Sequence, residues 1–276
     1  MTVVAVGSAK TRGVTTAAEL LVLLRPTGRR CVLVDADPAG GDWLLRPGVA
    51  PEPGLVSLAM AGRRRLGQGT VFDHVQVVGG LELVAGPAAA HQASTALQMI
   101  GDRLVAHLRN LADGRQDGSA APFDAVVDCG RLTPGSPALA AAAQADLAVL
   151  VSGATAAALV HLAPLVEMVR AAGGSPAVLL FGGDSRGPRY EPEEVAAGVQ
   201  ADVLGTMPDD PGAAGRLVDD PGRLDGLSRS RLAKSMTPVA ARAWAAAAER
   251  EPSPAAPAAA PAHEAYAPIG WRDQHG

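Results

Sequence analysis

The sequence is poor in aromatic residues, and lysine is rarer still. Aromatic residues make up 3% of the 276 residues, whereas hydrophobic residues make up 48%, so Ala, Val and Leu must build most of the core. With 19% charged residues, the bulk of the chain is apolar enough to bury a core and is not intrinsically disordered. The composition therefore predicts closely packed helices on a sheet.

Cysteine is also scarce, and this excludes several classes of protein. Cys31 and Cys129 lie far apart in the sequence, and neither has a partner at metal-ligand spacing. A zinc ribbon, an iron–sulfur centre held by this chain alone and a disulfide-rich secreted scaffold are therefore excluded.

Long apolar runs are missing as well. No uninterrupted stretch approaches the ~20 residues that span a bilayer, and Gln144 and Asp146 interrupt the closest candidate, 138–151. The first ten residues lack the basic segment and the long apolar run of a secretory signal. The net charge of −4 argues against a surface given over entirely to nucleic acid. We expect a soluble, cytoplasmic chain with at most a local basic patch.

Short β-branched runs alternate with longer helical patterns through the first 250 residues. The predicted strands are 3–6, 31–34, 125–127, 147–151, 177–181 and 203–204, with a hairpin at 75–84. The predicted helices are 15–24, 55–61, 89–111, 138–143, 155–172, 192–199 and 227–249. Strands that are apolar on both faces are typical of a parallel sheet covered by helices.

This alternation predicts an α/β fold with a doubly wound, mostly parallel sheet flanked by helices. We expect one domain over residues 1–250, with its ligand site at the carboxyl ends of the strands. From residue 251 the chain is rich in Pro and Ala and has no periodic face to bury, so 251–276 is predicted to be a disordered tail.

A loop of sequence GSAKTRGVTT, residues 7–16, joins the first predicted strand to the first helix. Backbone amides at such a helix N-terminus form a cradle for anions. A full P-loop reads Gly-x4-Gly-Lys-Ser/Thr, but Val14 stands where the Lys is expected, while Thr15 keeps the hydroxyl that holds Mg²⁺. The alternative is an ordinary strand-to-helix turn with Thr15 as the N-cap.

Acidic residues follow two other predicted strands. Asp35 and Asp37 come after the second strand, where carboxylates can hold the waters around Mg²⁺ and orient an attacking water; the alternative is a polar surface turn. Asp128 ends a later apolar strand and precedes Cys129 and Gly130. This is the Walker-B layout, in which a carboxylate on the Mg²⁺ side is followed by backbone able to approach the γ-phosphate.

The order of these segments resembles the ParA/MinD family of deviant Walker-A ATPases, which belongs to the nitrogenase-iron-protein-like class of P-loop NTPases. The family pattern Asp-x-Asp-Pro-x-Gly is matched by 35–40, its Walker-B Asp by Asp128, and its Gly-x-Ile-Pro-x-Asp by 205–210. The family loop Lys-Gly-Gly-x-Gly-Lys-Thr-Thr is matched imperfectly by 8–16. A variant subgroup with the loop Lys-Gly-Ser-Pro-Gly-Val-Thr-Thr looks closer. The resemblance spans about residues 2–250.

The resemblance implies ATP and Mg²⁺ as ligands and a nucleotide-sandwich homodimer. The nucleotide contacts that it implies are Ser8, Lys10, Thr11, Arg12, Gly13, Val14, Thr15, Thr16, Pro208 and Asp209. The Mg²⁺ site that it implies comprises Thr15, Asp35 and Asp128. In catalysis, Asp37 matches the residue that orients the attacking water, and Lys10 matches the signature Lys that reaches the partner's phosphates.

The departures from the family pattern predict weakened binding and at most a weak ATPase. Counting back from Thr15, the signature Lys falls at Ala9, whereas the Lys present is Lys10, so either the loop is one residue short or the signature Lys is lost. The second Lys is Val14, and one missing charged phosphate contact costs ~1.5–3 kcal/mol. The adenine-reading Asn is absent, because Phe-Gly-Gly-Asp occupies 181–184.

The resemblance implies a switch protein that positions a cargo, such as chromosomal DNA or a secretion or pilus machine, with a ParB-like protein or a secretion ATPase as partner. The alternative is a non-catalytic scaffold of the TadZ/CpaE type that recruits a secretion ATPase. The tail lacks the amphipathic helix by which MinD-type proteins bind membranes, so we expect no direct membrane anchor.

A basic set near the end of the predicted domain bears on the choice of cargo. Its members are Arg223, Arg229, Arg231, Lys234 and Arg242. Related proteins use basic surfaces in this region for sequence-independent DNA binding, which phosphate contacts drive. The alternative is a solvated helix face without a partner.

Overall fold

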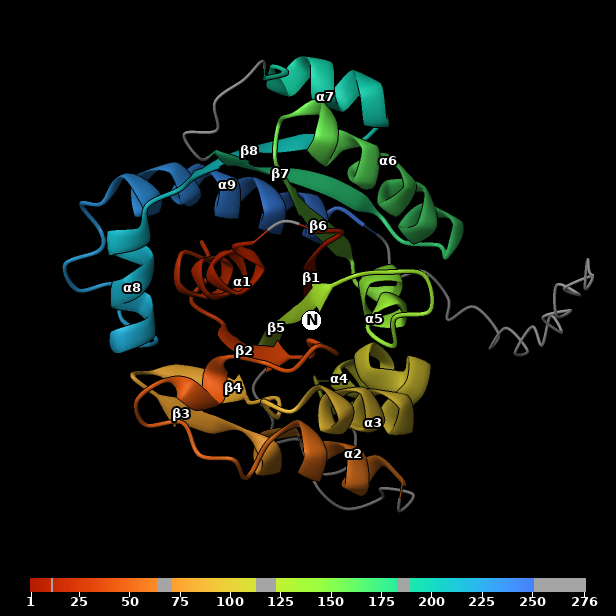
Figure 1. The fold of residues 1–276 in the computed structure, drawn as a ribbon. Helices are drawn as coiled ribbons and strands as arrows, with labels where there is room; N and C mark the ends of the chain where they lie inside the picture. Colours follow the sequence, from red (N-terminus) through yellow and green to blue (C-terminus); the bar gives the residue numbers. More distant parts are fainter. Residues whose placement is uncertain (11, 64–70, 113–122, 183–188, 251–276) are drawn as a thin grey trace, which may run out of the picture.

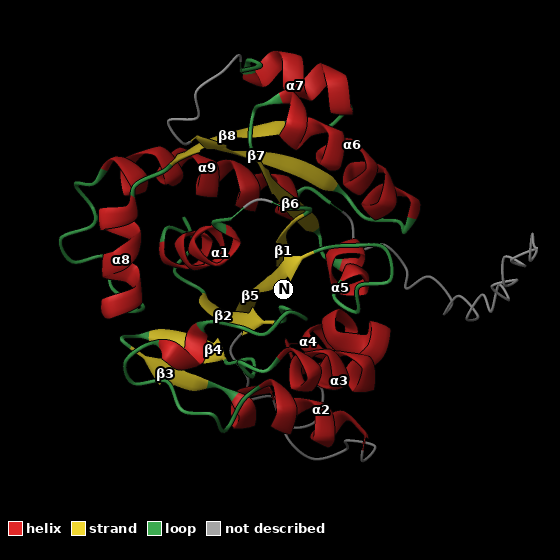
Figure 2. Ribbon diagram, viewed as in Figure 1, coloured by secondary structure: helices red, strands yellow, loops and turns green. Residues whose placement is uncertain are grey.

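The computed structural model describes residues 1–10, 12–63, 71–112, 123–182 and 189–250. In these residues eight strands form one sheet in the order β3-β4-β2-β5-β1-β6-β7-β8 (Figures 1 and 2). The strands are β1 (Val3–Ser8), β2 (Arg30–Asp35), β3 (Gln76–Val78), β4 (Leu81–Val84), β5 (Phe123–Arg131), β6 (Leu147–Ser152), β7 (Pro176–Gly182) and β8 (Val203–Pro208). Neighbouring strands run parallel, except in the β3–β4 hairpin. The predicted fold class is confirmed.

Helices cover both faces of the sheet (Figure 1). One face carries α1 (Val14–Leu23), α8 (Pro211–Asp219) and α9 (Arg231–Ala248). The opposite face carries α2 (Leu55–Arg63), α3 (Ala90–Ile100), α4 (Leu104–Ala112), α5 (Leu139–Gln144), α6 (Ala156–Ala171) and α7 (Pro192–Val199). Short 3₁₀ turns lie at η1 (Trp43–Leu45), η2 (Val71–His74) and η3 (Gly101–Arg103). Because both faces are covered, the central strands are buried on both sides.

Successive residues of β1 show how the two cores are divided. Val4 and Val6 pack into the core beneath α1 and α9, whereas Val3 and Ala5 pack into the core on the opposite face. This follows from the alternation of side chains along a strand. All four are at most 1% exposed, and the cores consist mainly of Ala, Val and Leu, as the composition predicted.

Two predicted helices differ from the structure by more than two residues at an end or in continuity. The single helix predicted at 89–111 is wrong, because α3 and α4 are separated by the 3₁₀ turn that begins at Gly101. Glycine is unfavourable inside a helix by about 1 kcal/mol relative to Ala. The last helix begins at Arg231 and not at residue 227, because the Ser230 side chain caps it by accepting from the Ala233 amide at 3.0 Å.

Helix α8 is absent from the sequence prediction. The Asp210 side chain caps it by accepting from the Ala213 amide at 3.0 Å, and Pro211 occupies its first turn. An Asp-Pro pair at these positions is a recognisable start signal. The β8–α8 connection matters for the site because β8 ends on the same side of the sheet as β1.

Two features predicted from sequence, Thr11 and the tail 251–276, lie outside the described residues. Within the described ranges, no helix combines the length and the hydrophobicity needed to cross a membrane.

Candidate functional site

A cavity of about 650 Å³ lies where the carboxyl ends of β1 and β5 meet the start of α1. We call it the loop cavity. Six of the residues predicted to contact a ligand line it: Ser8, Arg12, Gly13, Val14, Thr15 and Thr16. Asp37 lines it from the segment after β2. The structure therefore brings the first two sequence motifs to one cavity, at the strand ends where a doubly wound sheet binds its ligands.

Gly13 shapes the turn from β1 into α1. Its φ of 92° is in the left-handed region, and a Cβ there would lie 2.8 Å from the Met207 Cε atom and 3.1 Å from the Phe181 ring. The first hydrogen bond of α1 runs from the Ala17 amide to the Gly13 carbonyl at 2.9 Å. The amides of residues 14–16 precede that bond, so they have no partner within the helix. Amides without an intrahelical partner are the groups from which the predicted anion cradle would be built.

Val14 occupies the position of the expected P-loop Lys. Its side chain is only 7% exposed and packs in the core beneath α1 and α9. The first turn of α1 therefore presents backbone amides and the hydroxyls of Thr15 and Thr16 to the cavity, but no charged side chain.

Asp128 lies fully buried beside the loop cavity. The Gly130 amide donates to its Oδ1 at 3.0 Å, whereas Oδ2 has no hydrogen-bond partner among the described residues. Burial raises the pKa of Asp128, and the Thr15 hydroxyl lowers it by hydrogen bonding. A buried carboxylate oxygen without a partner is costly unless a cation or water completes its shell. Oxygen ligands of this kind fit Mg²⁺.

Asp35 is the neighbour of Asp128 in the sheet. The two residues pair in register on β2 and β5, and each is only 1% exposed. The amides of Gly86 and Asp37 donate to Asp35 at 3.3 and 3.4 Å. Burial and the nearby charge of Asp128 raise the pKa of Asp35. The two predicted Mg²⁺-side carboxylates are therefore together, and both need positive charge to be ionised at low cost.

Asp37 lies against the end of β5. A Cβ on Gly130 would lie 2.0 Å from the Asp37 Cγ atom, so only glycine fits there. The Ala39 amide donates to Asp37 Oδ1 at 2.8 Å. Burial raises the pKa of Asp37, and the charge of Arg131 lowers it. This carboxylate faces the same cavity as the α1 amides, as a residue that orients water near a bound anion must.

Arg12 connects the loop to the end of β8. Its guanidinium forms an ion pair with Asp209 and lies 5.5 Å from the centre of the Phe181 ring. The Asp209 amide donates to the Gly182 carbonyl at 2.7 Å, which joins the ends of β7 and β8. Pro208 and Asp209 do not line the loop cavity themselves; Asp209 is linked to it by its ion pair with Arg12, which does line the cavity.

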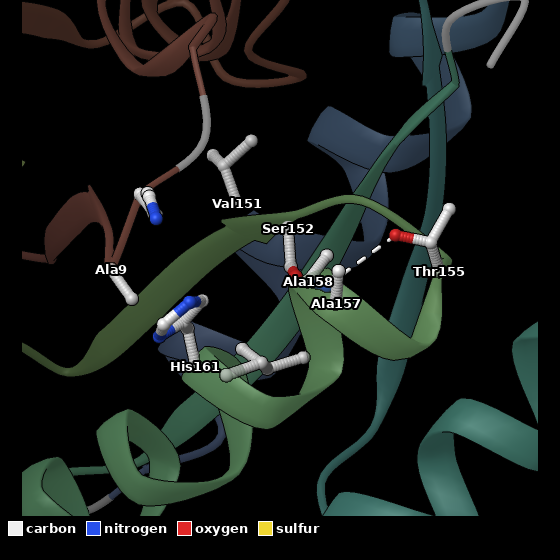
Figure 3. A pocket seen from close by; sticks show the side chains of 9 residues that line it. Ala9, Val151, Ser152, Thr155, Ala157, Ala158 and His161 are labelled. Atoms are coloured by element: carbon white, nitrogen blue, oxygen red, sulfur yellow. Dashed lines mark hydrogen bonds between the residues drawn. The ribbon is translucent and has the colours of Figure 1, made fainter.

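Lys10 lies on the other side of the loop. It lines a second cavity, of about 310 Å³, with Ser152, Thr155 and His161 at the start of α6 (Figure 3). Thr155 caps α6 by accepting from the Ala158 amide at 3.4 Å. Lys10 does not line the loop cavity, so the structure does not bring it together with the other predicted phosphate contacts.

Sequence reasoning missed two arginines that line the loop cavity. Arg46 comes from the segment after η1 and is 6% exposed, with its guanidinium 3.7 Å from the Trp43 ring. Arg131 is the exposed last residue of β5. The position of Arg131, directly after Asp-Cys-Gly, was a usable signal, whereas nothing in the spacing around Arg46 pointed to the cavity.

The basic set is only partly brought together. Arg231, Lys234 and Arg242 lie on the exposed side of α9. Arg229 is exposed just before that helix, while Arg223 forms ion pairs with Asp220 and Asp225 at 3.7 and 3.2 Å. Arg223 is therefore largely neutralised, and the members of the set that form no ion pair with a described residue lie on and beside α9.

No family model matches the sequence, and a search of curated proteins finds no match. Solved structures do match the fold. A ParA family ATPase from Chlorobium tepidum TLS aligns with a TM-score of 0.67 and 18% identity, covering 87% of this chain and 97% of that one. MinD from Pyrococcus horikoshii OT3, complexed with Mg-ADP, aligns with a TM-score of 0.64 and 17% identity, covering 87% and 94%. Cyanothece McdA in a complex with ATP gives a TM-score of 0.58 and 16% identity, covering 91% and 98%. The chain therefore has the fold of the ParA/MinD ATPases, as its motifs indicated.

Proposed function

We propose that this chain, which has the ParA/MinD fold, is an ATP·Mg²⁺-binding switch that dimerises to position a cellular cargo. One observation carries the proposal: among the described residues Oδ2 of buried Asp128 has no hydrogen-bond partner, and Asp128 lies beside Thr15 under a cavity where the first α1 amides have no partner within the helix. The buried carboxylate needs a cation, and the helix amides above it need an anion. The Mg²⁺-bound triphosphate of a nucleotide supplies both in one ligand.

Each part of the cavity has a role in this proposal. The amides of residues 14–16 hold phosphate oxygens, and Thr15, Asp35 and Asp128 hold the Mg²⁺ ion or its water shell. Bound Mg²⁺ would neutralise negative charge on the phosphates. Asp37 orients water at the cavity wall. The MinD–Mg-ADP and McdA–ATP structures support this choice of ligand.

The affinity for nucleotide is expected to be lower than in proteins with an intact loop. Buried Val14 removes one charged phosphate contact, at a cost of ~1.5–3 kcal/mol. Hydrolysis is accordingly slow or absent, and the switch depends more on binding than on turnover.

The cargo is DNA or a secretion or pilus machine in this proposal. Among the similar solved structures are a MinC:MinD cell division complex from Aquifex aeolicus and a plasmid partition protein from Borrelia burgdorferi. The unpaired charge on α9 favours DNA, with a ParB-like protein as partner. Recruitment of a secretion ATPase is the other form of the proposal.

Calorimetry with a non-hydrolysable ATP analogue and Mg²⁺ tests the nucleotide site. The wild type should bind, and Thr15→Ala and Asp128→Asn should each weaken Mg²⁺-dependent binding about tenfold or more. Thr95→Ala, on the exposed side of α3, is the matched control and should bind as the wild type does. No heat and no thermal shift at millimolar nucleotide would contradict the proposal and favour the TadZ/CpaE-like scaffold.

A further inference from the structure

The loop cavity has acidic walls but lacks the lysine that normally balances phosphate charge. Asp37 and Asp42 line it, and Asp35 and Asp128 are buried beside it. A bound polyphosphate would add negative charge to the loop cavity. Binding therefore requires cationic side chains other than the P-loop lysine. In the described part of the chain, the cationic side chains that line the cavity are Arg12, Arg46 and Arg131.

Two of these arginines already have acidic partners. Arg12 is paired with Asp209. Arg46 is paired with Glu19, and its Nη1 atom also lies 3.4 Å from the Leu217 carbonyl. Withdrawing either guanidinium for a ligand would leave a carboxylate without its partner, and Glu19 is completely buried.

Arg131 is different. In the described ranges its side chain forms no ion pair and no hydrogen bond, and it is exposed at the cavity wall. Its backbone is well fixed, because Arg131 pairs with Ser8 across the β1–β5 ladder and its amide donates to Asp37. The Arg131 guanidinium therefore has no hydrogen bond or ion pair to give up when an anion binds, although its charge also acts on Asp37.

The neighbours of Arg131 indicate which phosphate it meets. Arg131 lies beside Asp37, the residue assigned above to the water that attacks the terminal phosphate. Asp128, on the Mg²⁺ side, lies three residues earlier on the same strand. Because Asp37 would orient the water that attacks the terminal phosphate, a group beside Asp37 at the strand end would lie near that phosphate.

We propose that Arg131 binds the terminal phosphate of ATP and supplies the positive charge that Val14 lacks. This inference rests on the proposed nucleotide-binding function. A guanidinium forms two parallel hydrogen bonds to a phosphate and keeps its charge at all relevant pH values. Arg131 thereby makes the site selective for nucleoside triphosphate over diphosphate, which is the distinction that a switch needs.

The test compares a non-hydrolysable ATP analogue with ADP, each with Mg²⁺, by calorimetry on the full chain. Arg131→Ala should lower the affinity for the ATP analogue by about 10- to 100-fold and the affinity for ADP by less than about threefold. Arg131→Lys should recover part of the selectivity. Arg170→Ala, which removes an exposed α6 arginine paired with Glu167, is the matched control and should preserve both affinities.

The outcomes separate this inference from the proposed function. If the wild type binds neither nucleotide, the proposed function fails, and this inference fails with it. If the wild type binds the ATP analogue but Arg131→Ala keeps the same ratio of ATP-analogue to ADP affinity, only the role of Arg131 is overturned. Thermal melting without ligand shows whether Arg131→Ala is folded, and Arg131→Gln, which keeps a polar side chain but removes the charge, provides a second neutral variant.

Discussion

Arg46 donates from Nη1 to Glu19 Oε2 at 2.5 Å, and the side chains are 4% and 0% exposed. The Gly222 amide donates to the other Glu19 oxygen at 3.0 Å. This buried ion pair joins the middle of α1 to the segment after β2 and to the chain that follows α8. It therefore fixes one wall of the loop cavity to the helix whose first turn forms another.

Breaking this pair should be strongly destabilising. Glu19→Ala leaves the Arg46 guanidinium buried without its partner and should lower the free energy of unfolding by about 3–5 kcal/mol. Glu167→Ala, which breaks the exposed α6 pair with Arg170, is the control and should cost less than about 1 kcal/mol. Urea denaturation measures both. Similar losses of unfolding free energy in the two variants would show that burial does not determine how much the Glu19–Arg46 pair contributes to stability.

Asp128 should make the stability of the Mg²⁺-free protein depend on pH. Burial raises the pKa of Asp128 from 3.8 to about 6, so the folded state favours its neutral form. Its contribution to stability is therefore present below the unfolded pKa and is lost as the pH rises through the folded pKa. Asp128→Asn stays neutral and, in buffer with EDTA at about pH 8, should be more stable than the wild type by roughly 1–3 kcal/mol.

Melting curves between about pH 4 and pH 8 check this expectation, because the advantage of Asp128→Asn should vanish at the acidic end. Asp225→Asn, at a side chain that is 82% exposed, should show no such trend. A pH-independent difference between Asp128→Asn and the wild type would contradict the assignment.

Asp37 should matter for hydrolysis and not for binding. Asp37→Ala removes the carboxylate that orients water but leaves the α1 amides, Thr15 and Asp128 in place. We expect nucleotide affinity within about threefold of the wild type, with turnover lost and a nucleotide-bound dimer that persists. Phosphate release measures turnover, and light scattering measures the persistence of the dimer.

Asp102→Ala, at an exposed residue of η3, is the control and should keep the turnover of the wild type. Unchanged turnover in Asp37→Ala would remove Asp37 from the mechanism.

The basic side of α9 is the surface on which a DNA cargo would bind. If DNA is the cargo, random duplex DNA should bind with an affinity that falls steeply as the salt concentration rises. Removing Arg231, Lys234 and Arg242 by alanine substitution should reduce the log–log slope by about one unit for each lost phosphate contact. Arg223→Ala should change little, because Asp220 and Asp225 already neutralise that residue. Mobility shifts with and without ATP measure this, and no binding at low salt with ATP would exclude DNA.

Much of the fold could be predicted from short-range patterns. Apolar runs located the central strands, and the Gly79-Gly80 turn located the β3–β4 hairpin. One error arose where a single residue interrupts a periodic pattern, as Gly101 does between α3 and α4. Another arose where a helix with few apolar residues is indicated mainly by its cap, as α8 is by Asp210. Boundaries depend on such single hydrogen bonds and on tertiary packing, which periodicity does not register.

The sequence by itself determined the fold class and the motifs that meet at the strand ends, because parallel strands put their carboxyl ends on one edge. It also determined that Val14 cannot supply a charge. Only the tertiary structure decided that Lys10 and Thr15 line different cavities and that Arg12 forms an ion pair with Asp209. It also decided that, within the described residues, Arg131 is the arginine at the loop cavity without an ion pair. Those outcomes depend on which side chains from distant segments compete for the same partner, and charge pairing between residues far apart in the chain leaves no periodic signal in the sequence.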